Sequence, residues 1–158
     1  MARWLWLSVL IVALDQTAKA LAELLLAPYR PVPLFPFFNL TLMYNEGAAF
    51  SFLADAGGWQ RWTFAGFALL MTVALVVWLL RLNAHERMTA AAIALIVGGA
   101  VGNLIDRLMT GRVVDFLDVY YGRWHWPAFN VADSAITIGV ALLLLASLRS
   151  DSARKQSA

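Results

Sequence analysis

Four long apolar runs constrain this chain more than any other feature of its sequence. They cover residues 4–26, 62–80, 89–109 and 131–148. The second run carries no charge, and as a helix it would span about 28 Å, close to the thickness of a bilayer's hydrocarbon core. Since 61% of the residues are hydrophobic and only 14% are charged, the excess apolar surface must face lipid. The runs predict an all-α membrane fold, a bundle of four transmembrane helices in a single integral membrane domain, residues 1–158.

The first run has a second interpretation, as a secretory signal peptide, because Ala20-Leu21-Ala22 resembles a cleavage site. Asp15 and Lys19 interrupt the run before that site, and the apolar pattern resumes as far as Leu26. Processing signals seldom carry charges there. We therefore favour a membrane span.

Four spans return both termini to the same side of the membrane. Basic residues divide almost evenly between the two sides, but those on the terminal side lie in short tails and in the tight 81–87 loop. The positive-inside rule is strongest for such short segments. We expect a multi-pass protein with both termini in the cytoplasm.

Two segments, 27–61 and 110–129, then lie on the outer side. Phe38, Leu40, Leu42 and Tyr44 alternate with less apolar residues, which is typical of a strand. Residues 48–53 could return as a second strand after a turn at 45–47, and 113–121 is rich in β-formers. These patterns predict a small extracytoplasmic β-sheet, with tryptophans at the headgroup level.

Ionised residues inside a span must be paired, near the interface or functional. Asp15, Lys19 and Glu23 are four apart, so they share one face of the first helix, where Lys19 can pair with either acid. We interpret Asp15 and Lys19 as structural support, either a polar stripe between helices or indirect support of a site, with a direct role in catalysis as a third alternative. If Lys19 only pairs, Lys19→Met should lower stability more than turnover.

The third run combines small and polar residues. Gly98 and Gly102 should let a neighbouring helix approach closely. Asn103, Asp106 and Arg107 follow near the outer end. Asp106 and Arg107 could be an interfacial pair that marks the helix end, whereas for Asn103 and Arg107 a role in a site is equally open.

Asp115 and Asp133 lie at either end of the return between the third and fourth runs. The topology puts both carboxylates at similar depth on the same face, and Asn130 sits where a helix N-cap belongs. Two shielded carboxylates cannot both ionise cheaply, so they can share one proton, as in an aspartic protease. The helix N-terminus favours the ionised form at Asp133. Alternatively, Asp133 is only a helix-start charge and Asp115 an exposed loop residue.

Other chemistries fit the sequence less well. There is no cysteine, His85 and His125 are predicted on opposite faces, and we expect neither a metal site nor a cofactor. A net charge of +2 gives no reason to expect a nucleic-acid partner. A Ser51–His125–Asp118 triad is conceivable, although nothing nearby resembles a nucleophile elbow.

Five motifs in order resemble one family, lipoprotein signal peptidase, also called signal peptidase II. They are Asp15-Gln16 with Lys19, residues 44–51 (Tyr44-Asn45-Glu46-Gly47-Ala48-Ala49-Phe50-Ser51), residues 102–107 (Gly102-Asn103-Leu104-Ile105-Asp106-Arg107), residues 113–116 and residues 129–134. The resemblance covers nearly the whole chain.

The resemblance implies an aspartic endopeptidase of the bacterial cytoplasmic (inner) membrane, with no cofactor. It would cleave the signal peptide of diacylglyceryl-modified prolipoproteins just before the lipidated cysteine, near the extracytoplasmic face. Asp115 and Asp133 would be the catalytic pair. The residues implied to bind substrate are Asn45, Gly47, Asn103, Arg107 and Asn130, and Asp15 would support the architecture of the site. We expect Lys19 and Asp106 to be structural support as well. We expect the lipidated precursor and membrane lipid as partners and a monomeric enzyme.

Two rival classes remain. A small transporter or proton channel could use Asp15, Lys19 and the two aspartates as a relay. Four spans leave little room for a midplane site, however, and no repeated halves are visible. The second rival class is a membrane scaffold in which the charges only pair helices.

Overall fold

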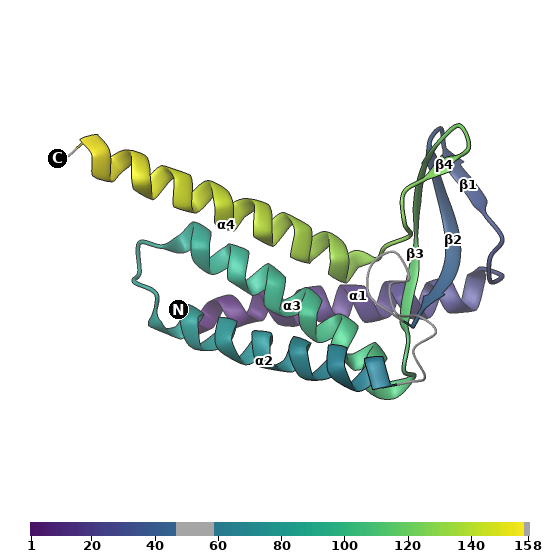
Figure 1. Ribbon diagram of the computed structural model, residues 1–158, viewed down its shortest axis with the longest axis horizontal. Coiled ribbons are helices and arrows are strands. Elements are labelled where there is room, and N and C mark those ends of the chain that lie inside the picture. The colour runs from purple at the N-terminus through teal and green to yellow at the C-terminus, as the bar shows by residue number, and fades with distance from the viewer. Residues whose placement is uncertain (47–58, 157–158) are drawn as a thin grey trace.

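A computed structural model describes residues 1–46 and 59–156 of the chain (Figure 1). After a short 3-10 turn, η1 (Ala2–Trp4), come four long helices: α1 (Leu5–Leu25), α2 (Trp59–Arg81), α3 (Arg87–Met109) and α4 (Val131–Gln156). Each is long and apolar enough to cross a membrane, as the four runs predicted. α4 differs from the expectation, because it continues beyond residue 148 into the polar tail and ends at Gln156.

α3 is the central helix and packs against each of the other three. Its buried face is built mostly from small residues, among them Ala90, Ala94 and Gly98. A side chain at Gly98 would come within 2.8 Å of the Ile11 side chain of α1, so only glycine permits this approach. Ser8 then donates from Oγ to the carbonyl oxygen of Ala94 at 2.7 Å, which joins α1 to α3. The predicted close approach of helices at the glycines is confirmed at this point.

The outer faces of the bundle are apolar. Phe67 and Leu70 of α2 are 64% and 66% exposed, and Leu24 and Leu144 lie as open on α1 and α4. A water-soluble protein rarely exposes so much contiguous apolar surface. Lipid is the solvent that this surface fits.

A four-stranded antiparallel sheet lies at one end of the bundle, in the order β1 (Val32–Phe35), β2 (Phe38–Asn45), β3 (Val113–Tyr121) and β4 (Trp124–His125). β2 and β3 occupy the two segments that the sequence predicted as strands. β1 was missed, because prolines at 31 and 33 argue against a strand. Proline is tolerated here because β1 is an edge strand, where one row of backbone groups needs no partner.

The sheet rests on the end of the bundle where α1 and α3 finish and α2 and α4 begin (Figure 1). Leu42, Val114 and Phe116 pack against Ala22 of α1 in a small core beneath it. Both termini and the 82–86 turn lie at the opposite end (Figure 1), as an even number of spans requires. The predicted return strand 48–53 falls outside the described residues.

Candidate active site

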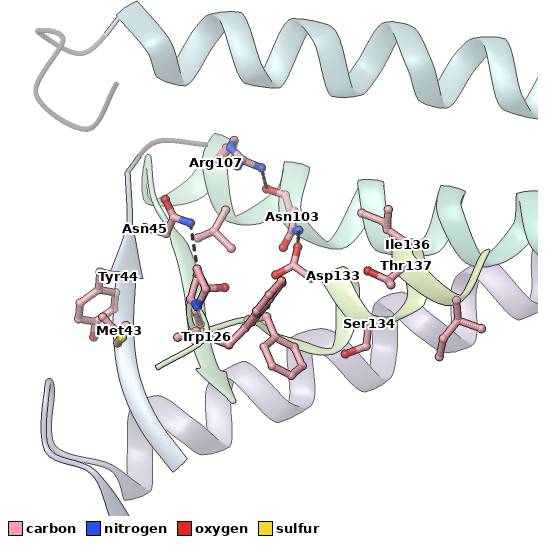
Figure 2. Close-up of a pocket in the computed structure, with 16 residues that line it drawn as sticks. Met43, Tyr44, Asn45, Asn103, Arg107, Trp126, Asp133, Ser134, Ile136 and Thr137 are labelled. Atoms are coloured by element: carbon pink, nitrogen blue, oxygen red, sulfur yellow. Dashed lines mark hydrogen bonds between the residues drawn. The ribbon is translucent and has the colours of Figure 1, made fainter. Parts of the chain in front are cut away.

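A cavity of about 680 Å³ lies between the sheet and the bundle (Figure 2). Asp115 and Asp133 both line it, although they come from β3 and α4, eighteen positions apart in the chain. Its polar wall also includes the predicted site residues Asn45, Asn103 and Arg107. Its other lining residues are mostly apolar: Met43, Tyr44, Val113, Trp126, Pro127, Ala128, Phe129, Ser134, Ile136, Thr137 and Ile138.

Asp115 is held on β3 by two amide groups. It pairs in register with Met43 of β2, and its residue is only 3% exposed. Asn130 donates from Nδ2 to Asp115 Oδ1 at 2.7 Å, and Asn45 donates from Nδ2 to Oδ2 at 3.2 Å. Asp115 is therefore a buried carboxyl with a defined orientation. The interpretation of Asp115 as an exposed loop residue is wrong.

Asp133 lies in the first turn of α4 and is partly exposed to the cavity. Asn103 of α3 donates from Nδ2 to Asp133 Oδ1 at 2.7 Å. Asn130 caps the helix: its Oδ1 accepts the Asp133 backbone N–H at 2.9 Å, and its own N–H reaches Asp133 Oδ2 at 3.3 Å. This is the reciprocal pattern of a capping box, and it confirms the predicted N-cap.

Asn130 consequently touches both carboxyl residues. It is fully buried, and besides Asp115 its Nδ2 lies 3.3 Å from the Val114 carbonyl oxygen. One side chain thus joins the end of β3 to the start of α4. The shared partner fixes the position of one aspartate relative to the other.

The environment of Asp115 favours its protonated form. Burial, and after it the negative charge of Asp133, raise the pKa of Asp115 to about 7, against the lowering effect of its amide partners. At neutral pH both the protonated and the ionised forms of Asp115 are therefore populated. This is the property that a general acid or base requires.

Arg107 contributes a fixed positive charge to the same cavity. Its guanidinium lies 5.7 Å from the ring centre of Phe64 on α2 and 3.5 Å from the carbonyl oxygen of Asn103. It is placed to meet anionic or carbonyl groups that enter the cavity. Gly47, which was predicted to bind substrate, lies outside the described residues.

The charges inside the first helix form a buried cluster beside the cavity. Lys19 lies 2.7 Å from Asp15 and 2.7 Å from Asp106 of α3, and it donates to Asn103 Oδ1 at 2.9 Å. The predicted pairing with Asp15 is present. The alternative in which Asp106 pairs with Arg107 is replaced by an ion pair between Asp106 and Lys19, because these two side chains meet across the α1–α3 interface.

Sequence reasoning missed the wall formed by residues 126–129. The backbone of Phe129 exchanges hydrogen bonds with Leu117, and Trp126 donates to the carbonyl oxygen of Val119. These bonds extend the sheet irregularly over the cavity. The Trp-Pro dipeptide at 126–127 signals extended backbone, but nothing in the sequence places it beside Asp133.

The two histidines lie at opposite ends of the bundle. His85 sits in the turn between α2 and α3, and His125 in β4. His125 Nδ1 meets Asp118 Oδ1 at 2.8 Å, while Asn39 and Thr41 of β2 donate to the other oxygen. Asp118 thus joins β2, β3 and β4 through side-chain contacts. Ser51, the third member of the conceivable triad, lies outside the described residues. Over 1–46 and 59–156, no group of three acidic or histidine side chains could hold a metal ion.

Comparison with known proteins gives consistent matches. A family model described as signal peptidase (SPase) II matches residues 7–149. Lipoprotein signal peptidase of Aeromonas hydrophila is 54% identical over 150 residues, covering 94% of this chain and 90% of the relative. That of Ectopseudomonas mendocina is 52% identical over 157 residues, covering 98% and 93%. A bacterial membrane enzyme solved by the in meso method at 2.3 Å resolution has 33% identity and a TM-score of 0.86, covering 96% of this chain and 91% of its own.

Proposed function

This chain belongs to the signal peptidase II family, whose members cleave signal peptides from prolipoproteins, and from that premise we propose that it is an aspartic endopeptidase with Asp115 and Asp133 as the catalytic pair. The observation that carries the proposal is the Asn130 side chain. It donates to Asp115 and accepts from the backbone of Asp133, so both carboxyl groups face one cavity in a fixed relation.

In the proposed reaction the two aspartates play opposite parts. Asp115, whose pKa burial raises to about 7, holds the shared proton and donates a hydrogen bond to the scissile carbonyl oxygen. We assign the ionised form to Asp133, because it lies in the first turn of α4, where the helix dipole favours a negative charge. It removes a proton from a water molecule while that water's oxygen attacks the carbonyl carbon. When the tetrahedral intermediate collapses, the C–N bond breaks and the leaving nitrogen takes that proton.

The remaining cavity residues fit the handling of a peptide substrate. Arg107, Asn45 and Asn103 supply donors and acceptors around the dyad, as a peptide backbone requires. We assign the three, together with Asn130 and Gly47, to substrate binding or to the immediate support of the dyad. Arg107 keeps its charge at any physiological pH, so it can hold carbonyl oxygens at the end of a signal helix.

The shape of the cavity supports a lipid-modified substrate. Its wall follows the first turns of α4 through Ile136 and Thr137 (Figure 2). The lining also includes Ile138, which is 54% exposed. A diacylglyceryl group attached next to the scissile bond could therefore remain in the bilayer while the peptide reaches the dyad. We propose that cleavage occurs just before the lipidated cysteine.

We further propose a monomer in the bacterial inner membrane, with both termini in the cytoplasm and the sheet and dyad at the extracytoplasmic face. Tryptophans 59, 62, 124 and 126 lie at the sheet end of the bundle and are at least half exposed, as interfacial anchors are. Cysteine labelling from outside intact cells, at position 123 and at position 84, should modify the first position alone.

The direct test uses the full chain in lipid bilayers and two precursors that differ only in the diacylglyceryl group on cysteine. The proposal expects release of the signal peptide from the lipidated precursor, with the lipidated cysteine as the new N-terminus by mass spectrometry. Equal cleavage of both precursors would contradict the substrate assignment. Absence of cleavage of either would contradict the proposed function.

A further inference from the structure

Lys19 is a buried cation whose three N–H donors all have acceptors. It is 3% exposed, and its ammonium group contacts Asp15 Oδ2 and Asp106 Oδ2 at 2.7 Å and Asn103 Oδ1 at 2.9 Å. No donor remains for substrate or water. The ammonium is therefore fixed in place and joins α1 to α3.

Each of the two carboxylates paired with Lys19 also accepts a hydrogen bond from the backbone of another element. Asp15 Oδ1 accepts the N–H of Ala132 at 2.9 Å, and Asp106 Oδ2 accepts the N–H of Val114 at 3.3 Å. Ala132 directly precedes Asp133, and Val114 directly precedes Asp115. Each carboxylate paired with Lys19 thus binds the backbone N–H of the residue just before a member of the dyad.

The approach that Asp15 needs depends on Gly102. A Cβ atom there would lie 2.6 Å from Asp15 Oδ2, closer than side chains come to one another. Glycine at this position leaves room for the carboxylate between α3 and the start of α4. Charge pairing between Lys19 and Asp15 alone would not require Asp15 to reach the backbone of α4.

The third hydrogen bond of the Lys19 ammonium orients the side-chain amide of Asn103. Asn103 Oδ1 faces the ammonium and also accepts from Asn130 Nδ2 at 3.2 Å, so its nitrogen must point the other way. There it donates to Asp133 Oδ1 at 2.7 Å. A flipped Asn103 would set its N–H₂ against the Lys19 ammonium, two donors facing each other.

We propose that Lys19 is a positioning residue for the dyad: through Asp15, Asp106 and Asn103 it sets the separation and orientation of Asp115 and Asp133. The inference rests on the proposed function, since it assigns a role toward the same catalytic pair. Lys19 itself contacts none of the reacting atoms. It acts by holding the two backbone positions from which the carboxyl groups extend.

Steady-state kinetics of Lys19→Met in lipid bilayers test this role. Methionine keeps an unbranched side chain as far as the Cε position, lacks the ammonium group and so removes all three bonds. Misplacement of reacting groups by about 1 Å can cost about 100-fold in rate, so we expect kcat to fall by about that factor while KM stays within about threefold. KM should change little because the precursor still contacts the same cavity wall.

Ser8→Ala is the matched control. Ser8 is buried in the same α1–α3 interface, but its bond to Ala94 lies toward the opposite end of both helices. Its loss should lower the thermal midpoint and leave kcat unchanged. Each variant is assayed well below its own midpoint, so that stability alone cannot reduce turnover.

A second variant keeps the test valid if Lys19→Met does not fold. In Lys19→Met/Asp106→Asn one positive and one negative charge disappear together, so the net charge of the cluster is unchanged. We expect a folded protein with kcat still about 100-fold low. Wild-type kcat in either folded variant would overturn the inference, and loss of folding in both would assign Lys19 to helix packing alone and overturn it equally. If instead Asp115→Asn kept full turnover, the proposed function itself would fail.

Discussion

Replacing Asn130 separates two roles of one buried side chain. Its oxygen caps α4 by accepting the Asp133 N–H at 2.9 Å, while its nitrogen donates to Asp115 at 2.7 Å. Asn130→Ala removes both. Asn130→Ser keeps a capping oxygen, because serine caps helices about as well as asparagine, but it cannot reach Asp115 with an amide nitrogen.

The free energies of unfolding follow from these contacts. Loss of an N-cap costs about 1 kcal/mol, and loss of a buried hydrogen bond to a carboxyl group costs about 2 kcal/mol. Asn130→Ala should therefore be destabilised by about 3 kcal/mol and Asn130→Ser by about 2 kcal/mol. Both should lose about 100-fold in kcat, since both leave Asp115 without its shortest hydrogen bond.

The assay is cleavage of a lipidated precursor in bilayers, with thermal unfolding followed by tryptophan fluorescence. The informative comparison is between the two variants, which should differ in stability and agree in turnover. Wild-type kcat in Asn130→Ser would refute the claim that its amide positions Asp115. Equal stability of the two variants would refute the capping role.

Two further predictions concern pH and packing. Cleavage should decline above about pH 7, where Asp115 loses its proton. Because folding raises the pKa of Asp115 above its unfolded value of about 4, the free energy of unfolding should also fall as pH rises from about 4 to about 7. Asp115→Asn should flatten this pH dependence of stability, and an unchanged dependence in that variant would contradict the assignment. Gly98→Ala should lower the thermal midpoint, because the added methyl lies 2.9 Å from the Ser8 carbonyl oxygen, whereas Gly66→Ala, with nothing within 4 Å, should not; equal midpoints would contradict the described contact of α1 with α3.

The bundle was predictable because lipid imposes a simple pattern on sequence. Runs of about twenty apolar residues have few alternatives to a membrane-spanning helix. β2 and β3 were readable from alternation and β-propensity. The start of α4 was readable from Asn130, because capping chemistry is local.

What could not be predicted depends on contacts between distant segments. Lys19 has two acids within one turn of its own helix, so the sequence could not show that Asp106 of α3 is a partner. Phe37 adopts a left-handed φ of 71° between β1 and β2, a conformation that its residue type does not signal. The grip of Asp15 on the Ala132 N–H joins positions 117 apart.

The most direct test of the account is kcat for Asp115→Asn, Asp133→Asn and the double variant, with each protein shown to unfold cooperatively. Because the two carboxyl groups work as one unit, each single variant should lose at least about 1,000-fold, and the double variant should be no worse than either. Residual turnover within about tenfold of wild type in either single variant, or losses that multiply in the double variant, would contradict a shared catalytic proton.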